Sequence, residues 1–109
     1  MVSKQKVLVT GASGLIGGLV IKNLGDKYEF SALNRRPMEG IASIQADISN
    51  FDSIHPAFDG IHTVLHLGAL ATPGLTNNWD GIASTNIYGT FNVYEASRIS
   101  GVKRIVFAS

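Results

Sequence analysis

The sequence predicts an α/β fold in which helices cover both faces of a parallel sheet. An apolar run at residues 7–9 leads into Gly11, Gly14 and Gly17, and apolar residues at helical intervals follow these glycines. Strand-length apolar segments then alternate with helical ones along the rest of the chain. A hydrophobic content of 45% in 109 residues suits one domain with a core of its own.

Five strands are predicted, at residues 6–10, 28–33, 41–46, 63–67 and 104–108. Helices are predicted at residues 14–24, from Ser49 to Phe58, and at residues 78–100. Ser49 and Asp52 form a candidate capping pair, and Asp59-Gly60 ends that helix. Gly25 is expected to close the first helix in the left-handed conformation, and Gly101 is expected to end the last helix.

The first strand, turn and helix form the pattern of a dinucleotide-binding turn. Gly11 permits a sharp turn, Gly14 leaves the backbone open to a diphosphate, and Gly17 allows the helix to lie close to the strand. The predicted contacts are the amide groups of the turn and the helix start, at Gly11, Ser13, Gly14, Leu15, Ile16 and Gly17. The fold class is therefore a Rossmann-type doubly wound sheet.

The sequence stops directly after a predicted strand. Because parallel sheets carry helices on both faces, we interpret residues 1–109 as an NAD(P)-binding domain truncated after its fifth strand. A complete flavodoxin-like domain that binds FMN is the alternative.

Composition restricts the possible partners. A formal net charge of +1 gives no electrostatic reason to expect nucleic acid or an anionic membrane. The chain has no cysteine, which excludes disulfides and thiolate metal sites, and we expect no bound metal. The N-terminal residues resemble neither a signal peptide nor a membrane span, so the cytoplasm is the expected compartment.

Several segments together resemble one family. They are residues 10–17 (TGASGLIG), Asp47 with Ile48, residues 66–69 (HLGA), residues 86–96 (NIYGTFNVYEA) and residues 104–109 (RIVFAS). In this order they look like the extended short-chain dehydrogenase/reductase superfamily, also called the NAD-dependent epimerase/dehydratase family. Residues 66–69 and 94–109 look most like uronate dehydrogenases, although sugar-nucleotide epimerases and dehydratases share much of this pattern.

The resemblance implies roles for residues beyond the glycine turn. Asp47 would accept a hydrogen bond from the adenine amino group, and the amide of Ile48 would bind a ring nitrogen; a simple turn-forming aspartate is the alternative. A second group would contact the cofactor or its surroundings: Leu67, Gly68 and Ala69 beside the riboses, and Asn86 in the active-site hydrogen-bond network. Small residues at 68 and 69 equally fit close packing, and Asn86 equally fits an exposed helical position.

The end of the second strand determines the choice of nicotinamide cofactor. A carboxylate there binds the ribose 2′-hydroxyl of NAD and repels the 2′-phosphate of NADP. This chain has Asn34, Arg35 and Arg36 instead, and an arginine can bind a phosphate bidentately. NADP is therefore the predicted cofactor, with NAD as the alternative. The lack of an acidic residue departs from uronate dehydrogenases, and the arginines equally fit a solvated loop.

The remaining polar residues receive structural interpretations. His66 lies in an apolar strand without a ligand partner and is expected to be a packed core histidine, while His55 and His62 are assigned to the surface or turns. Gly89 and Thr90 in the long helix predict close packing of that helix on the sheet.

The resemblance also implies catalytic groups that this chain lacks. In the family, a tyrosine and a lysine four residues later carry out proton transfer, but no Tyr-x-x-x-Lys occurs here, and the catalytic serine or threonine usually lies just beyond Ser109. We expect the parent protein to be an NAD(P)-dependent oxidoreductase, epimerase or dehydratase acting on a sugar, uronate or nucleotide sugar, and to form a homodimer. A noncatalytic NADP-binding redox sensor or scaffold is the alternative.

Overall fold

The computed structural model describes residues 4–11, 15–34, 40–67 and 87–107 of the chain. Within them, five parallel strands form one sheet in the order β3-β2-β1-β4-β5. Their bounds are β1 Lys6–Thr10, β2 Glu29–Asn34, β3 Ala42–Gln45, β4 Thr63–His66 and β5 Arg104–Phe107. This is the Rossmann strand order, whereas a flavodoxin-like sheet has the order 2-1-3-4-5. The flavodoxin-like alternative is therefore excluded.

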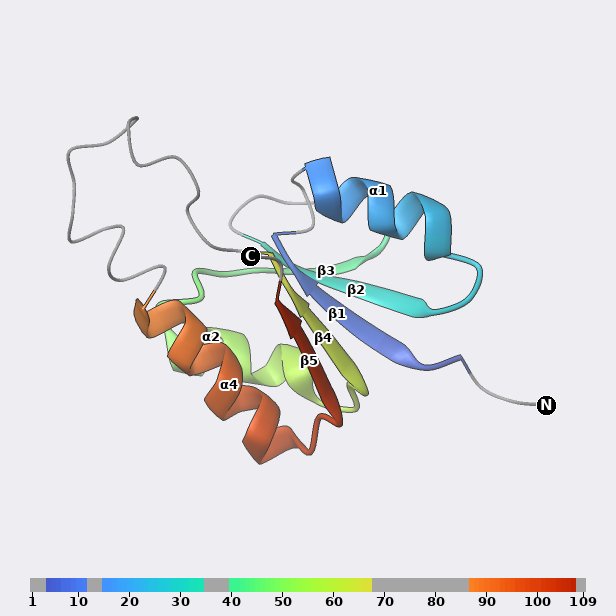
Figure 1. Cartoon of the computed structure of the whole chain (residues 1–109). Coiled ribbons are helices and arrows are strands. Elements are labelled where there is room, and N and C mark those ends of the chain that lie inside the picture. Colours follow the sequence, from blue (N-terminus) through green and yellow to red (C-terminus); the bar gives the residue numbers. More distant parts are fainter. Residues whose placement is uncertain (1–3, 12–14, 35–39, 68–86, 108–109) are drawn as a thin grey trace.

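Helices cover both faces of the sheet (Figure 1). Helix α1 (Leu15–Leu24) lies on one face, and α2 (Phe51–Ile54), the 3₁₀ helix η1 (His55–Phe58) and α4 (Gly89–Ser100) lie on the other. This two-sided arrangement confirms the predicted doubly wound architecture.

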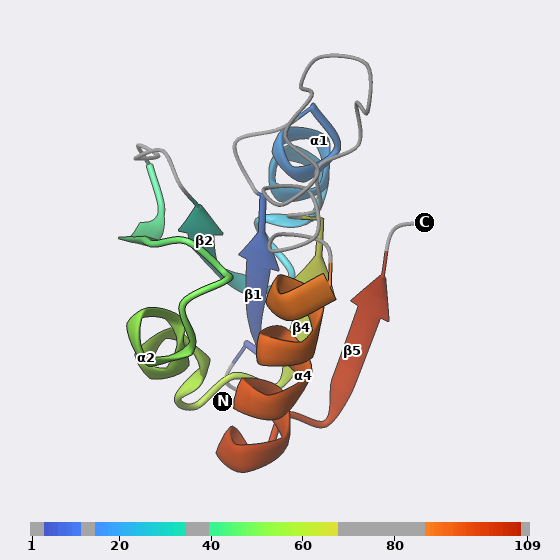
Figure 2. The same ribbon diagram turned by 90° about the vertical axis from the view of Figure 1, so that its left-hand side faces the viewer.

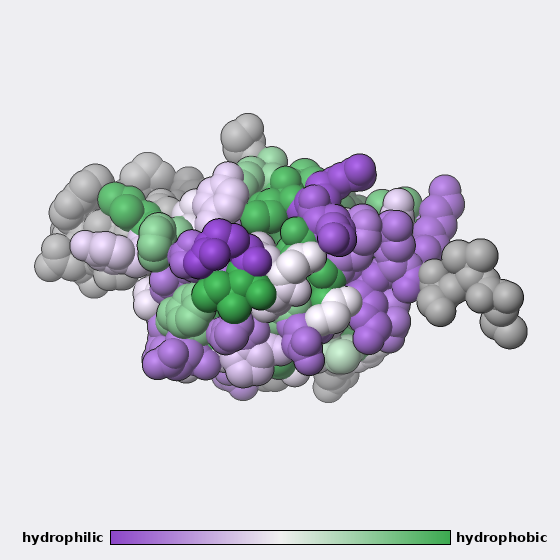
Figure 3. Space-filling view, turned by 90° about the horizontal axis from the view of Figure 1, so that it is seen from below, coloured by the Kyte–Doolittle hydropathy of each residue, from purple (hydrophilic) through white to green (hydrophobic). Residues whose placement is uncertain are grey.

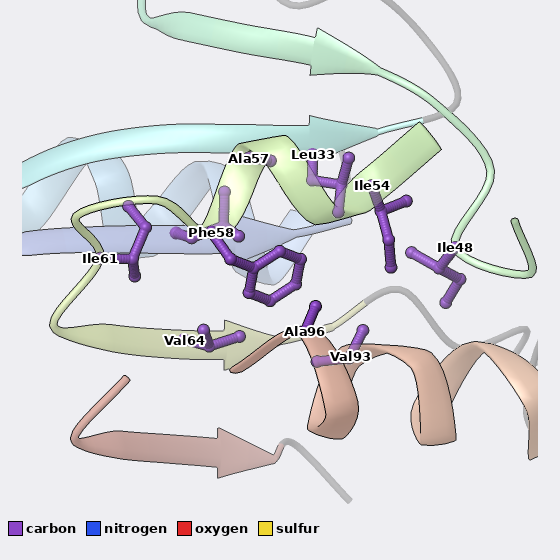
Figure 4. Packing of buried hydrophobic residues seen from close by; sticks show 10 residues of the cluster. Leu33, Ile48, Ile54, Ala57, Phe58, Ile61, Val64, Val93 and Ala96 are labelled. Carbon is purple, nitrogen blue, oxygen red and sulfur yellow. The ribbon is translucent and has the colours of Figure 1, made fainter. Parts of the chain in front are cut away.

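The side chains of β1 alternate between the two layers, as a pleated strand requires. Leu8 faces the larger core cluster, while Val7 and Val9 face the smaller one with Ala32. The larger cluster fills the space between the sheet, η1 and α4 (Figure 4). Its buried members are Leu8, Leu33, Ile48, Ile54, Ala57, Phe58, Ile61, Val64, Val93 and Ala96.

All strands run in the same direction, so their carboxyl ends meet at one edge (Figure 2). The register pairs Thr10 with Leu33 on one side and with His66 on the other. Asn34 pairs with Gln45 one strand further out. The segments that follow β1, β2, β3 and β4 therefore leave the sheet at a common edge, where ligands bind in open α/β sheets.

The strand predictions are confirmed to within one or two residues. The Gly101 cap is also confirmed, with φ of 78° and its N–H bonded to the carbonyls of Ser97 and Arg98. Gly60, which has φ of 74°, ends the segment after η1 as expected. Of the long helix predicted at residues 78–100, the structure describes the part from residue 87 onward.

The prediction of a left-handed Gly25 is wrong. The residues with positive φ in the described chain are Gly11, Gly40, Gly60 and Gly101. Past Gly25 the chain continues in a helical turn, because the N–H groups of Lys27 and Tyr28 both donate to the carbonyl of Leu24. These bonds satisfy the carbonyl of Leu24, the last residue of α1, without a left-handed residue.

The predicted capping pair of Ser49 and Asp52 is also wrong. Asn50 is the N-cap of α2, and its side chain accepts a hydrogen bond from the N–H of Ser53. The helical segment ends at Phe58 as predicted, but it changes from α to 3₁₀ at His55. Pro56 has no N–H to donate to the carbonyl four residues earlier, so the tighter helix replaces the α-helix there.

Candidate functional site

The turn after β1 begins at the carboxyl edge of the sheet. Gly11 has φ of 72°, a conformation that disfavours any side chain, and its N–H donates to the carbonyl of Leu33 at 3.1 Å. Helix α1 begins at Leu15, and Gly17 in its first turn is buried. The sequence predicted this strand, a sharp turn at Gly11 and a helix start one residue earlier, at Gly14; the positive φ of Gly11 is what makes the turn possible. Ser13 and Gly14 lie outside the described residues, and for Leu15 and Ile16 the structure describes the backbone.

The segment after β3 lies beside the end of β2. Asn34 is buried, and its carbonyl accepts from the N–H of Ala46 at 2.8 Å. Next in the chain, Oδ1 of Asp47 accepts from both the N–H and the hydroxyl of Ser49, at 2.9 and 2.8 Å. Asp47 is thus a turn-forming aspartate, which is the alternative that the sequence left open for this residue. That bonding is also compatible with a ligand-binding role, because a carboxylate has about four lone-pair sites.

Ile48 connects this turn to α4. Its side chain is buried in the larger core cluster, and its carbonyl accepts from Nδ2 of Asn92 at 2.9 Å. A β-carbon built on Gly89 would lie 2.6 Å from Cδ1 and Cγ1 of Ile48. The prediction of close packing at Gly89 is confirmed, although the neighbour is a loop residue after β3 and not a strand of the sheet.

His66, the last residue of β4, joins three elements through its ring. Nδ1 lies 2.7 Å from Oγ1 of Thr10 on β1, and Nε2 lies 3.4 Å from Oγ1 of Thr90 on α4. The ring also packs edge-on against Phe107 of β5, with centroids 5.4 Å apart. Since a hydroxyl both donates and accepts, the two threonines satisfy a neutral imidazole in either tautomer. The prediction of a packed core histidine is confirmed.

Burial lowers the pKa of His66 below its usual value of 6.5, because a charged ring loses hydration in the interior. His66 is therefore neutral at physiological pH. The N–H of Leu67, the next residue, donates to both the carbonyl and the hydroxyl of Thr10 at 3.0 Å. These bonds fix the direction in which the chain leaves β4.

The structure thus brings together Gly11, Asn34, Asp47, Ile48 and Leu67 at one edge of the sheet. The other predicted site residues, Arg35, Arg36, Gly68, Ala69 and Asn86, lie outside the described residues. Sequence reasoning did not identify Asn92. One signal was available: Gly89 and Asn92 are poor helix formers three positions apart, which places them on one face of α4.

The comparisons with known proteins agree with this geometry. Residues 7–109 match the model of the NAD dependent epimerase/dehydratase family. The chain belongs to this family.

Two relatives in the epimerase/dehydratase family illustrate the similarity. L-arabinose 1-dehydrogenase (NAD(P)(+)) of Haloferax volcanii is 36% identical over 104 residues, which cover 95% of this chain and 40% of the relative. Uronate dehydrogenase of Pseudomonas putida is 34% identical over 111 residues, which cover 96% of this chain and 40% of the relative. The chain therefore spans about 40% of the length of these enzymes.

Solved structures of the family show the same fold. The uronate dehydrogenase of Agrobacterium tumefaciens aligns with a TM-score of 0.85 and 29% identity, covering 96% of this chain and 40% of that one. A mutant of that enzyme complexed with NAD aligns with a TM-score of 0.86 and 28% identity, covering 98% of this chain and 41% of that one. These matches agree with the strand order described above.

In the parts of the chain that the structure describes, no three histidine or acidic side chains gather closely enough to hold a metal ion. No helix in the same ranges combines the length and apolar character needed to cross a membrane.

Proposed function

We propose that this chain binds the adenosine and diphosphate of a nicotinamide dinucleotide. The observation that supports this proposal most directly is the convergence of Gly11, Asn34 and the Asp47–Ile48 pair at the carboxyl edge of one parallel sheet. Left-handed Gly11 opens the turn in which helix-start amides would bind the diphosphate. Asp47 and the N–H of Ile48 would bind adenine, and the riboses would lie along Leu67, Gly68 and Ala69.

The protein that contains this chain is proposed to be an NAD(P)-dependent oxidoreductase, epimerase or dehydratase. Its substrate class would be a sugar, uronate or nucleotide sugar, as in the relatives named for L-arabinose, uronate and UDP-glucuronate. When bound, the nicotinamide supplies hydride transfer. The residues of this chain bind and orient the dinucleotide, Asn86 would support the active-site network, and a tyrosine outside residues 1–109 would carry the proton.

NADP is the proposed cofactor, with NAD as the alternative. The residue at the end of β2 is Asn34, so no carboxylate stands there to repel a 2′-phosphate, and Arg35 and Arg36 follow it directly. A charged hydrogen bond contributes about 1.5–3 kcal/mol, so one good contact would favour NADPH about ten- to a hundredfold.

Equilibrium titration of the full-length protein with NADPH and NADH tests this choice. Arg35→Ala is expected to weaken NADPH binding and to leave NADH binding unchanged. Arg104→Ala is the matched control, because Arg104 is the first residue of β5 and therefore lies at the opposite, amino edge of the sheet. NADH binding as tight as NADPH binding, unaffected by Arg35→Ala, would exclude phosphate recognition. If the wild-type protein bound neither nucleotide, the proposed function itself would be wrong.

A homodimer is proposed as the assembly, with α4 at its interface. Large hydrophobic side chains are exposed along α4 and just before it, at Ile87, Tyr88, Phe91, Tyr94 and Ile99. Figure 3 views the face covered by α2 and α4, where hydrophobic surface interrupts the hydrophilic surface. Phe91 is 63% exposed, so Phe91→Glu is expected to dissociate the dimer without unfolding the protein. Sedimentation of the full-length protein tests this expectation, and a wild-type monomer would overturn it.

We also propose the cytoplasm as the compartment of the protein. The cysteine-free sequence is compatible with reducing surroundings.

A further inference from the structure

Helix α4 contacts the Asp47–Ile48 turn in two different ways. Nδ2 of Asn92 donates to the carbonyl of Ile48 at 2.9 Å, across a separation of 44 residues in the chain. One turn earlier on α4, Gly89 faces the Ile48 side chain so closely that a β-carbon would approach it to 2.6 Å. The helix therefore contacts both the main chain and the side chain of Ile48.

These contacts leave Ile48 little freedom to move. Its side chain is 6% exposed and belongs to the same core cluster as Ile54 and Val93. Figure 4 shows it at one end of that cluster, on the segment that leads from β3 toward α2. With the side chain and the carbonyl of Ile48 both held, its Cα and backbone nitrogen have a fixed position, and rotation about φ is the one freedom left to its N–H.

The residues before and after Ile48 are also held by hydrogen bonds. The N–H of Ala46 donates to the carbonyl of Asn34 at 2.8 Å, and the N–H of Asn50 donates to the carbonyl of Asp47 at 3.0 Å. These bonds are local or lie next to the sheet, whereas the bond from Asn92 comes from a separate helix. Asn92 thus connects this turn to α4.

We propose that Asn92, with Gly89, is a positioning residue for adenine recognition. Asn92 itself does not touch the ligand. It holds the carbonyl of Ile48 so that the neighbouring N–H and the Asp47 carboxylate face the adenine ring together. This inference rests on the proposed function, because it requires adenine to bind at Asp47 and Ile48.

The test compares NADH with reduced nicotinamide hypoxanthine dinucleotide on the full-length protein. Hypoxanthine carries a carbonyl oxygen in place of the adenine amino group and a proton on the adjacent ring nitrogen, so it loses both proposed contacts. The wild-type protein should therefore bind NADH more tightly. Asn92→Ala removes one neutral hydrogen bond from the turn, and we expect it to reduce the NADH preference roughly three- to tenfold.

The ratio of the dissociation constants for NADH and its hypoxanthine analogue distinguishes a loss of positioning from a loss of folded protein. A loss of folded protein lowers the number of binding sites and leaves that ratio unchanged. Asn23→Ala is the matched control, because Nδ2 of Asn23 also donates to a main-chain carbonyl, that of Leu19, at 2.8 Å but in an exposed position. It should retain the full preference of the wild-type protein.

Three outcomes would overturn the inference, and each would locate the failure at a different step of the reasoning. If Asn92→Ala keeps the wild-type preference while Asp47→Ala loses it, Asn92 has no positioning role. If Asp47→Ala keeps the preference, adenine is recognised elsewhere. If the wild-type protein binds neither dinucleotide, NADPH and its hypoxanthine analogue take their place in the same comparison. Failure to bind these as well would overturn the proposed function and the inference with it.

Discussion

Replacing Thr10 with valine tests how much the buried His66 network contributes to stability. The substitution keeps the side-chain shape and removes the hydroxyl, which lies 2.7 Å from Nδ1 of His66. Leu67 keeps its bond to the carbonyl of Thr10, whereas Nδ1 of His66 loses this partner. Both residues are buried, with Thr10 at 0% and His66 at 4% exposure. Leaving such a group unpaired costs about 1–3 kcal/mol.

Scanning calorimetry of the full-length protein measures this cost. The chain spans about 40% of the relatives' length, and a protein of that length, about 270 residues, has an unfolding entropy of about 0.6 kcal/mol/K. A destabilisation of about 1–3 kcal/mol therefore lowers the melting temperature by roughly 2–5 °C. Thr63→Val is the matched control, since Oγ1 of Thr63 also lies 2.7 Å from an imidazole nitrogen, Nδ1 of His62, in a partly exposed site. Water can replace that hydroxyl, so the control should change the melting temperature little. Equal shifts for Thr10→Val and Thr63→Val would refute the reasoning.

A double substitution adds a second criterion. When both partners of a buried hydrogen bond become apolar, no unpaired group remains, and the change can be nearly neutral. Thr10→Val combined with His66→Phe should therefore cost less than the sum of the two single substitutions. Additive costs would show that the two side chains are not coupled.

Three further outcomes are expected. Burial lowers the pKa of His66, so below pH 6.5 the unfolded chain binds a proton that the folded chain excludes. The stability contributed by the neutral imidazole is therefore complete above pH 6.5 and decreases as the pH falls, by at most about 1.4 kcal/mol per pH unit. Calorimetry at a series of pH values should show this slope, and the slope should disappear in His66→Phe. Gly89→Ala should lower the melting temperature, because crowding against Ile48 costs about 1–3 kcal/mol and outweighs a gain of about 1 kcal/mol in helix propensity. Gly101→Ala should destabilise the protein by about 1 kcal/mol, because φ is 78° at that position. Gly18→Ala should stabilise it by a similar amount, because Gly18 lies inside α1 with open space around it. Equal effects of the two substitutions on the melting temperature would contradict this expectation.

Local patterns in the sequence predicted most of the fold. Apolar runs located every strand, and Gly11, Gly60 and Gly101 were assigned to turns or caps where the structure gives each a positive φ. Gly25 shows the limit of this reasoning, since a glycine after a helix permits a left-handed residue but does not require one. At Gly25 the carbonyl of Leu24 takes its partners from a further helical turn instead.

The candidate site was predictable where its residues follow the ends of strands. Parallel strands bring their carboxyl ends to one edge, so the spacing of Gly11, Asn34 and Asp47 along the chain already implied their proximity. The contacts that hold these segments were not predictable in the same way. Asn92 and Ile48 are 44 residues apart, and no periodicity of one element specifies the neighbour of a side chain on another.

The role of α4 follows from the directions of two nearby side chains. Thr90 and Asn92 are two positions apart, so they project from different sides of the helix. Thr90 reaches His66 at the end of β4, while Asn92 reaches Ile48 beyond β3. One helix thus connects the His66 network, next to the turn proposed for the diphosphate, with the turn proposed for adenine. Gly89, in contact with Ile48, sets how closely the start of α4 approaches the second of these segments. The spacing between the two halves of the proposed nucleotide site therefore depends on the packing of α4.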